Sequence, residues 1–210
     1  MKKIVITLLP IVFFVGCSIK NVHPLYSRSE LVDKTLVVMS ISYDIKLKDI
    51  EFNKDDGYFT GWRNPEVILQ NLSNKEWYRI QSAPYSSLML FESKSHYENK
   101  WGKLIVVEVA AGVYRVPEWR ISWGNSLYTV KPFFEPSYKF EPGEIVYLGE
   151  YQIDIHFGKD KYGYVRKDDM TIAISNKYER DIQLVDKMYE NLKGEKIQNV
   201  FQEAPKPQSI

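Results

Sequence analysis

Only a few side chains of this 210-residue chain have the type and the spacing that chemistry requires. The single cysteine, Cys17, follows an uncharged run over residues 4–15, and Lys2 and Lys3 precede that run. A lone cysteine is a buried thiol, a nucleophile or a point of covalent attachment. The residues before it help to decide between these roles.

The first sixteen residues have the layout of a signal peptide. Two lysines are followed by the apolar run IVITLLPIVFFV and then by Gly16. This run is shorter than the roughly 20 apolar residues that cross a membrane, and Pro10 weakens any helix that it forms. We therefore predict that residues 1–16 are a signal peptide.

The stretch Val15-Gly16-Cys17 resembles the lipobox of bacterial lipoproteins. In that family the cysteine thiol receives a diacylglycerol and becomes the first residue of the mature chain, although Phe14 stands where leucine is usual. The resemblance implies lipidation at Cys17 and contact with a membrane through this lipid. Because Ser18 follows, it also implies a cell-envelope location, at the outer membrane facing the periplasm. The alternative is a core cysteine behind a signal-like run.

Catalytic and metal-binding motifs are absent from the sequence. It contains no G-x-S-x-G elbow, no H-E-x-x-H, no cysteine pair and no glycine-rich phosphate loop. His23 and His96 stand apart, whereas Asp154 and His156 share one side of a predicted strand that Asp160 could approach. That trio is a weak metal or acid-base candidate, and a solvated strand face is the simpler interpretation. We expect no catalytic residue, no metal and no cofactor.

Aromatic residues are the other candidate signal, with five Trp, fifteen Tyr and ten Phe. Trp62 stands beside Arg63, and an exposed pair of this kind can form a protein-binding hot spot or a surface on which sugars stack. Trp119 and Trp123 share a predicted apolar face and favour a core role. Trp62 and Arg63 are therefore the predicted partner-binding residues.

The charge balance argues against nucleic acid as a partner. Loss of Lys2 and Lys3 with the signal peptide reduces the 28 basic side chains to 26, against 27 acidic ones. The mature chain then has a net side-chain charge of −1. A phosphate backbone requires a basic excess, which this chain lacks.

Polarity divides the mature chain into three parts. Residues 17–33 are polar and without period, which is typical of a lipidated tether. Residues 34–201 are expected to form one domain, because no repeat or strong linker interrupts them. The tail, residues 202–210, has no apolar pattern and is predicted to be disordered.

Alternation of apolar and polar residues predicts several strands. Residues 36–45 alternate clearly, and the odd positions of 145–157 share an apolar face, with a bend or a change of sheet possible at Gly149. Residues 103–124 read as two strands joined at 110–112. The second of these changes parity at Pro117, which predicts a bulge or break.

One amphipathic helix is predicted near the carboxyl end, over about residues 176–193. Asn176 is its expected cap and Gly194 its expected stop. Five apolar residues form its stripe: Tyr178, Ile182, Val185, Tyr189 and Leu192. The fold class is therefore mainly β, an antiparallel β-sandwich with one C-terminal helix.

Three segments add a family resemblance: AAGVYRV, YKFEPGEIVYLGEYQI and ERDIQLVDKMYENLKG. They look like the pattern of a poorly characterised group of bacterial lipoproteins, with a glycine-tyrosine hairpin, a Pro-Gly-Glu turn into a strand, and a late helix. The domain of that group is similar to the carboxypeptidase regulatory-like, transthyretin-like sandwich. The resemblance covers about half of the mature chain and implies no catalytic residues.

The leading functional hypothesis is a lipid-anchored envelope protein that acts as a binding or structural module. Its expected partner is an envelope protein or a cell-wall glycan. The alternative is an envelope hydrolase whose site is assembled from distant loops.

Overall fold

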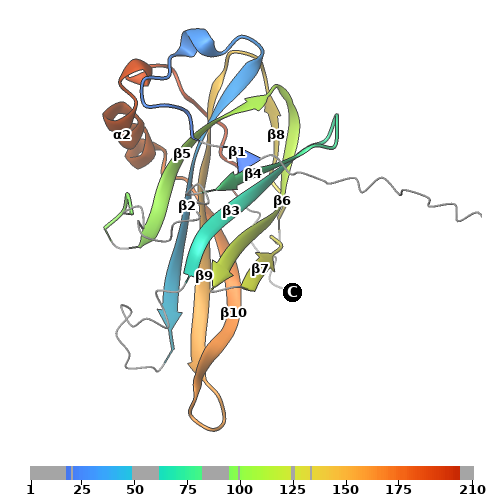
Figure 1. The fold of residues 1–210 in the computed structure, drawn as a ribbon, viewed down its shortest axis with the longest axis vertical. Helices are drawn as coiled ribbons and strands as arrows, with labels where there is room; N and C mark the ends of the chain where they lie inside the picture. The colour runs from blue at the N-terminus through green and yellow to red at the C-terminus, as the bar shows by residue number, and fades with distance from the viewer. Residues whose placement is uncertain are drawn as a thin grey trace, which may run out of the picture.

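The chain folds into two β-sheets, with one α-helix lying against the outer side of one of them (Figure 1). The computed structural model describes residues 18–19, 21–48, 62–81, 95–98, 100–123, 126–132 and 134–203. The predicted signal peptide, Cys17 and most of the predicted tail therefore lie outside the described residues. In the part described, no helix is long and apolar enough to cross a membrane.

Sheet A has the strand order β1-β4-β3-β6-β7, with β8 also paired to β6. Its strands are β1 (Ser18–Ile19), β3 (Trp62–Asn71), β4 (Trp77–Gln81), β6 (Gly112–Trp123), β7 (Ser126–Val130) and β8 (Ser137–Phe140). Sheet B has the order β10-β9-β2-β5, with β11 also paired to β9. Its strands are β2 (Lys34–Leu47), β5 (Trp101–Ala110), β9 (Ile145–Lys159), β10 (Val165–Ser175) and β11 (Gln198–Asn199).

The mainly β character is confirmed, but both sheets are mixed. Most neighbouring strands are antiparallel, whereas β1 pairs with β4, β2 with β9 and β11 with β9 in parallel. No hairpin joins β2 to β9, because strands of both sheets lie between them in the chain. The expectation of purely antiparallel strands is thereby corrected.

The connection between β5 and β6 also differs from expectation. The tight turn predicted near residues 110–112 is present, and Gly112 has a φ of 150°. However, β5 belongs to sheet B and β6 to sheet A, so the turn carries the chain from one sheet to the other. The hairpin implied by the family resemblance does not form here.

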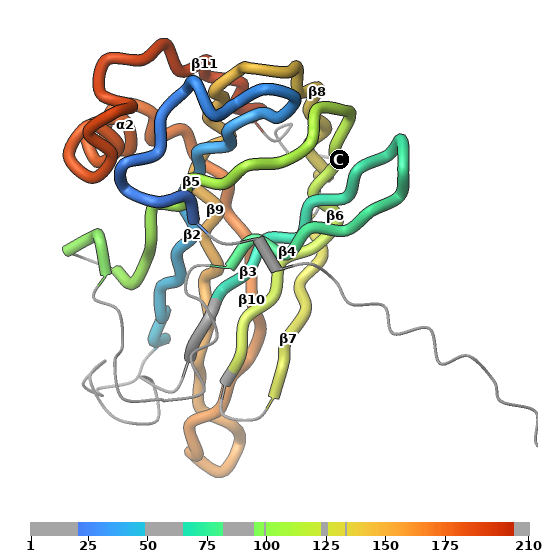
Figure 2. The backbone as a smooth tube through the Cα atoms, turned by 45° about the horizontal axis from the view of Figure 1, so that its top comes forward, coloured from blue at the N-terminus to red at the C-terminus, as the bar shows by residue number. Residues whose placement is uncertain are grey.

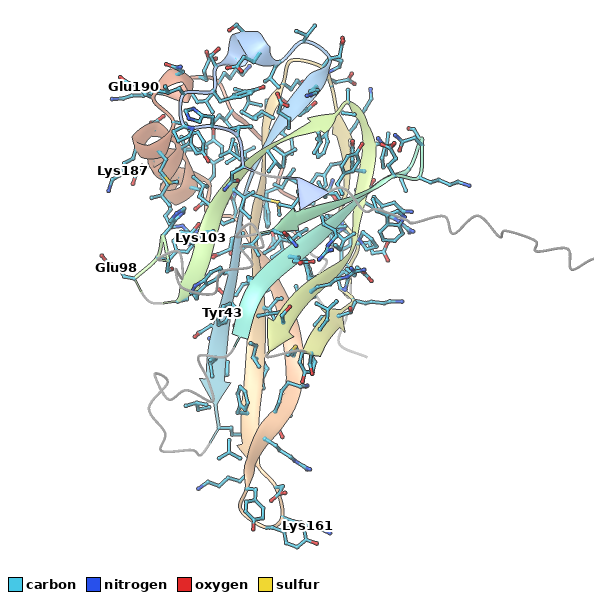
Figure 3. The ribbon with its side chains drawn as sticks, viewed as in Figure 1. Tyr43, Glu98, Lys103, Lys161, Lys187 and Glu190 are labelled. Atoms are coloured by element: carbon cyan, nitrogen blue, oxygen red, sulfur yellow. The ribbon has the colours of Figure 1, made fainter. Side chains whose placement is uncertain are left out.

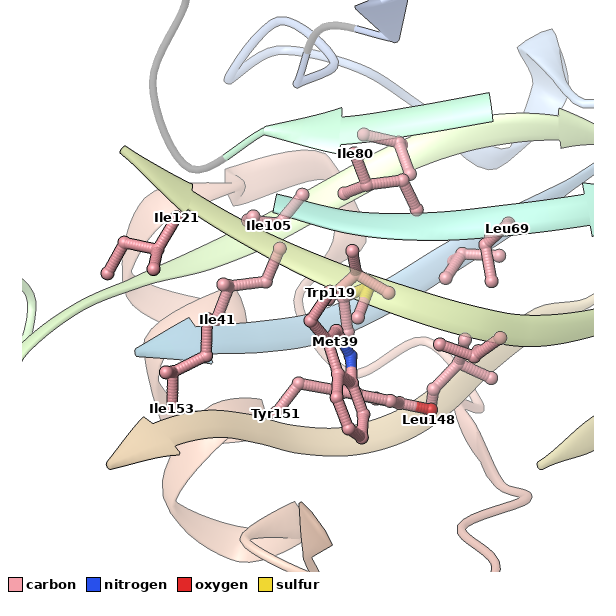
Figure 4. Close-up of a cluster of buried hydrophobic side chains, with 14 of the residues drawn as sticks. Met39, Ile41, Leu69, Ile80, Ile105, Trp119, Ile121, Leu148, Tyr151 and Ile153 are labelled. Carbon is pink, nitrogen blue, oxygen red and sulfur yellow. The ribbon is translucent and has the colours of Figure 1, made fainter. Parts of the chain in front are cut away.

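The main core lies between the two sheets, as Figure 4 shows for ten labelled residues. Residues 37, 39, 41, 43 and 45 of β2 all join it, as their alternation predicts. From sheet A the core receives Val67 and Trp119, and the Trp119 ring meets that of Tyr151 edge-on at 5.4 Å. Both sheets therefore bury one face in the same apolar cluster.

A bulge in β9 changes which face its side chains occupy. Val38 lies opposite Tyr147 and Ser40 opposite Glu150, so β9 uses three residues where β2 uses two. Gly149 sits at this point with a φ of 111°. The odd-numbered residues beyond the bulge, from Tyr151 to Phe157, face sheet A, but Ile145 and Tyr147 face the helix. The expected single apolar face over residues 145–157 is therefore wrong before Gly149, and the register shift lies where a bend or a change of sheet was predicted.

The bulge predicted at Pro117 is also present. In the ladder between β3 and β6, Ile68 lies opposite Glu118 and Gln70 opposite Arg115, which leaves one extra residue on β6. Residues 114 and 116 before the bulge and 119 and 121 after it all enter the core.

The predicted helix begins two residues later than expected and ends in a tighter turn. Helix α2 spans Tyr178–Met188, and the short 3-10 helix η2 spans Glu190–Leu192. Asn176 accepts the backbone N–H of Tyr178 at 3.1 Å, and Gly194 has a positive φ of 76°. All five residues of the predicted stripe pack in a second apolar cluster on the outer face of sheet B.

The segment expected to be a tether is part of the fold. Tyr26 and Leu31 are buried in the cluster beneath α2, on either side of the 3-10 helix η1 (Arg28–Glu30). Val22 N–H donates to Val106 O at 2.8 Å, and Asn191 Nδ2 donates to Leu25 O at 2.6 Å. The expectation that residues 17–33 are only a tether is corrected for the stretch from Val22 to Leu31. Isolated apolar residues without a period can still be buried one at a time.

Candidate functional site

The most concentrated polar chemistry lies beneath α2, around the fully buried Asp181. Its Oδ2 accepts hydrogen bonds from Ser40 Oγ at 2.6 Å and from Tyr147 OH at 2.8 Å. Its Oδ1 accepts from Arg180 Nε at 2.8 Å and lies 3.4 Å from Tyr97 OH. Asp181 also lies in the first turn of α2, where a negative charge complements the helix dipole.

A second buried carboxylate, Glu150, completes the cluster. Lys100 Nζ lies 2.6 Å from its Oε1, which also accepts Ser42 Oγ at 2.9 Å. Arg180 Nη1 lies 3.5 Å from its Oε2 and so links the two carboxylates. Burial raises the pKa of Glu150, but the hydrogen bond from Lys100 and the charges of Arg180 and Lys100 outweigh this and lower it overall. Glu150 is therefore a paired carboxylate, as a buried charge must be.

The two tyrosines of the cluster are held in their neutral form. Burial, followed by the negative charge of Asp181, raises the pKa of both Tyr97 and Tyr147. The guanidinium of Arg180 lies 4.1 Å from the centre of the Tyr97 ring, which adds a cation-π contact. These contacts join the loop at residues 95–98 to the helix and the sheet.

The cluster is organised to dock α2 on sheet B, and it lacks the arrangement of an activated nucleophile. Ser40 Oγ donates to a carboxylate, so no imidazole takes its proton. His96 uses Nδ1 to accept the backbone N–H of Leu104 at 3.0 Å, and burial lowers its pKa. Sequence reasoning missed this cluster, but a signal existed. Asp181 stands three residues after Tyr178 and four before Val185, inside the apolar stripe of the predicted helix.

Each of the three residues of the weak acid-base candidate has its own hydrogen-bond partner. His156 Nε2 lies 3.0 Å from Thr171 Oγ1, and Asp154 accepts from Gln152 Nε2 at 2.6 Å. Asp160 accepts the backbone N–H groups of residues 162 and 164 in the turn after β9. Across the described ranges, no three His, Cys, Asp or Glu side chains are grouped so that they could hold a metal ion.

The predicted partner-binding residues lie at one end of sheet A. The backbone of Trp62 opens β3 opposite Trp123, and Arg63 lies opposite Ser122 of β6. The side chains of Trp62, Arg63 and Trp123 lie outside the described part of the structure. Trp119 is buried between the sheets, which confirms its predicted core role.

An exposed aromatic pair at the tip of the β9–β10 hairpin was missed by sequence reasoning. Tyr162 is 72% exposed and Tyr164 is 73% exposed. Figure 3 shows the neighbouring Lys161 at this tip, beyond the rest of both sheets. Lys161 Nζ lies 4.9 Å from the centre of the Tyr162 ring. The signal for the tip was the stretch KDKYGY, two tyrosines around a glycine in a charged turn.

Comparison with known proteins gives no family. No family model matches the chain, and no curated protein matches it. Among solved structures, a leucine-rich repeat protein from Bacteroides thetaiotaomicron VPI-5482 matches with a TM-score of 0.30 and 12% identity. The match covers 76% of this chain and 16% of that one.

Proposed function

We propose that this chain is a lipid-anchored cell-envelope protein whose β-sandwich acts as a binding module. Two observations support a sandwich: both sheets contribute to one core, and Trp119 of sheet A meets Tyr151 of sheet B. The signal-like amino terminus and the lipobox at Cys17 support the anchor. The proposed partner is an envelope protein or a cell-wall glycan.

The aromatic tip of the β9–β10 hairpin is the observation that carries the binding role. Its turn is fixed by Asp160, whose N–H donates to Tyr164 O and whose Oδ1 accepts two backbone N–H groups at 2.8 and 3.0 Å. Tyr162 and Tyr164 are therefore presented on an ordered backbone while their rings face solvent. A tyrosine has few rotatable bonds, so binding through it costs little conformational entropy.

The direction of β3 supports including Trp62 and Arg63 in the same proposed contact region. β3 runs from Trp62 to Asn71, and the ten residues of a strand span about 30 Å. Figure 1 shows that its first end and the tip of the β9–β10 hairpin lie toward the same end of the molecule. We include Trp62 and Arg63 in the proposed partner-binding surface for this reason.

The binding role is tested by substituting both tip tyrosines. We expect Tyr162→Ala with Tyr164→Ala to weaken retention on isolated cell-wall glycan, or crosslinking to an envelope protein from position 161, by about thirtyfold. This corresponds to the roughly 2 kcal/mol that a hot-spot aromatic contributes. The matched Tyr162→Phe with Tyr164→Phe variant keeps both rings and should retain most binding. Undiminished retention and crosslinking by the alanine variant would contradict the proposal.

The anchor is tested independently through Cys17. The Cys17→Ser variant should remain an unprocessed precursor that takes up no labelled palmitate, whereas the normal chain should be labelled and stay with the membrane. Equal labelling of the two proteins would end the lipoprotein interpretation.

A further inference from the structure

The amino-terminal segment closes the open side between the two sheets. Ser18 lies opposite Arg79 on β4, the edge of sheet A that β1 covers. A few residues later, Asn21 Oδ1 accepts the N–H of Val106 at 2.9 Å, and the next residue donates to the carbonyl of Val106. Val106 belongs to β5, the edge strand of sheet B. Residues 18–22 therefore include contacts to an edge of each sheet.

This pairing fixes how far the predicted lipid attachment residue can lie from the sheet. Cys17 is joined to Ser18 by one peptide bond, which separates their α-carbons by about 3.8 Å. Neighbouring strands lie about 4.8 Å apart, and Trp77 stands two residues before Arg79 on β4. The α-carbons of Cys17 and Trp77 are therefore no more than about 15 Å apart.

An exposed apolar patch lies on the outer face of sheet A at this end. Trp77 lies opposite Gln70, whose Oε1 accepts Arg115 Nε at 2.7 Å on that face. Val113 precedes Arg115 by two residues, and its carbonyl accepts the N–H of Leu72 at 2.8 Å. The side chains of Leu72, Trp77 and Val113 are all exposed. Together they define the hairpin patch, named after the β3–β4 hairpin, which Figure 2 shows projecting from the molecule.

We propose that the hairpin patch rests on the phospholipid surface, with Leu72 and Trp77 entering the headgroup layer. This inference depends on the proposed lipid anchor at Cys17. A diacylglyceryl chain in the bilayer holds its cysteine at the level of the headgroups, so Trp77, within about 15 Å of that residue, brings the hairpin patch close to the same surface. Tryptophan is suited to this layer because its ring is apolar and its N–H is polar. Lys75, exposed in the same turn, adds a positive charge toward anionic headgroups.

The proposed contact orients the whole domain. Leu72 lies just beyond the last residue of β3, whereas Trp62 opens that strand about 30 Å away. With the hairpin patch on the lipid, the Trp62 end of sheet A and the tip with Tyr162 and Tyr164 face away from the membrane (Figure 1). The anchor then sets which surface meets the partner, in addition to retaining the protein.

The test uses the lipidated full-length protein in vesicles of phosphatidylethanolamine and phosphatidylglycerol. Leu72→Cys and Leu127→Cys variants are labelled with an environment-sensitive dye, and the native Cys17 is unreactive because its sulfur forms the thioether. Leu127 is a matched control, since it is 53% exposed against 44% for Leu72 and lies on β7, the opposite edge of sheet A. We expect quenching by nitroxide-headgroup lipids to be several-fold stronger at position 72. Dye at position 162 should behave like dye at position 127.

Each outcome of this test bears on the inference. Lipidated protein whose dye is quenched equally at positions 72 and 127 refutes the membrane-facing patch and leaves the anchor intact. Shielding of position 72 in native envelopes without quenching in pure lipid vesicles means that a protein covers the patch, which also refutes it. If mass spectrometry finds no lipid on Cys17, the proposed anchor fails, and this inference fails with it.

Discussion

The packing of residues 21–31 on the domain predicts a measurable loss of stability when one buried side chain of this segment is removed. Leu31 is 7% exposed, whereas its neighbour Val32 is 75% exposed. A buried Leu→Ala change typically costs 2–5 kcal/mol, and we expect about 2–3 kcal/mol for Leu31→Ala because the site lies at the border of its cluster. Val32→Ala should stay within about 0.5 kcal/mol of the parent.

Equilibrium unfolding in urea is the appropriate measurement, on a chain that begins at Ser18 and so lacks the lipid. The midpoint should fall for Leu31→Ala with an unchanged slope, which reports stability alone. A Tyr26→Phe variant isolates the hydrogen bond from Tyr26 OH to Glu108 Oε1, 2.5 Å long, and should cost about 1 kcal/mol. Equal midpoints for Leu31→Ala and Val32→Ala would refute the conclusion that this segment belongs to the core.

Three further predictions concern the helix, the buried carboxylates and the strand bulge. Asp181→Ala should cost about 3–5 kcal/mol, because it removes the acceptor of several buried donors and one of the two carboxylates that Arg180 contacts. Ala at the exposed Glu179 of the same helix should cost little, and thermal unfolding compares the two variants. The pKa of Glu150 is lowered in the folded state, so its stabilisation is complete above the ordinary pKa of 4.5 and is lost as the pH falls through the folded pKa. Glu150→Gln should therefore flatten the acid limb of stability against pH, measured by urea midpoints. Gly149→Ala should destabilise the fold more than Gly163→Ala. Both glycines have a positive φ, but only at Gly149 would a Cβ lie 2.7 Å from a ring carbon of Phe201. Chemical denaturation of the two variants measures the difference.

The local apolar pattern was sufficient to predict the buried side chains of elements that bury a single face. The alternation over residues 36–45 identified the side chains of β2 that enter the main core. The stripe of α2 and η2 identified the side chains that cover sheet B. In both cases a single periodicity describes the burial, because each element presents one apolar side to a defined neighbour.

Contacts between distant segments could not be predicted from the local sequence pattern. The first half of β9 is buried on both faces. Apolar residues therefore occupy odd and even positions alike, and the sequence does not indicate which face meets the other sheet. The sheet to which β6 belongs depends on its pairing with β3 and β8, about 20 to 60 residues away in the chain. The polar contacts of Asp181 reach Ser40, 141 residues away, and only the fold brings them together.

The amino-terminal segment shows why composition alone misplaced the start of the domain. Polar, aperiodic sequence normally indicates a linker, because it offers no continuous apolar face. This segment instead covers exposed edges of two sheets, and backbone groups make part of that contact, as with Val22 and Val106. Edge strands require such protection, since unpaired backbone groups invite association with other chains. The same segment protects the sheet edges and carries the proposed lipid, so the proposed anchoring depends on the folding of this segment. If the segment detached from the edges, the domain would lose its fixed orientation on the membrane.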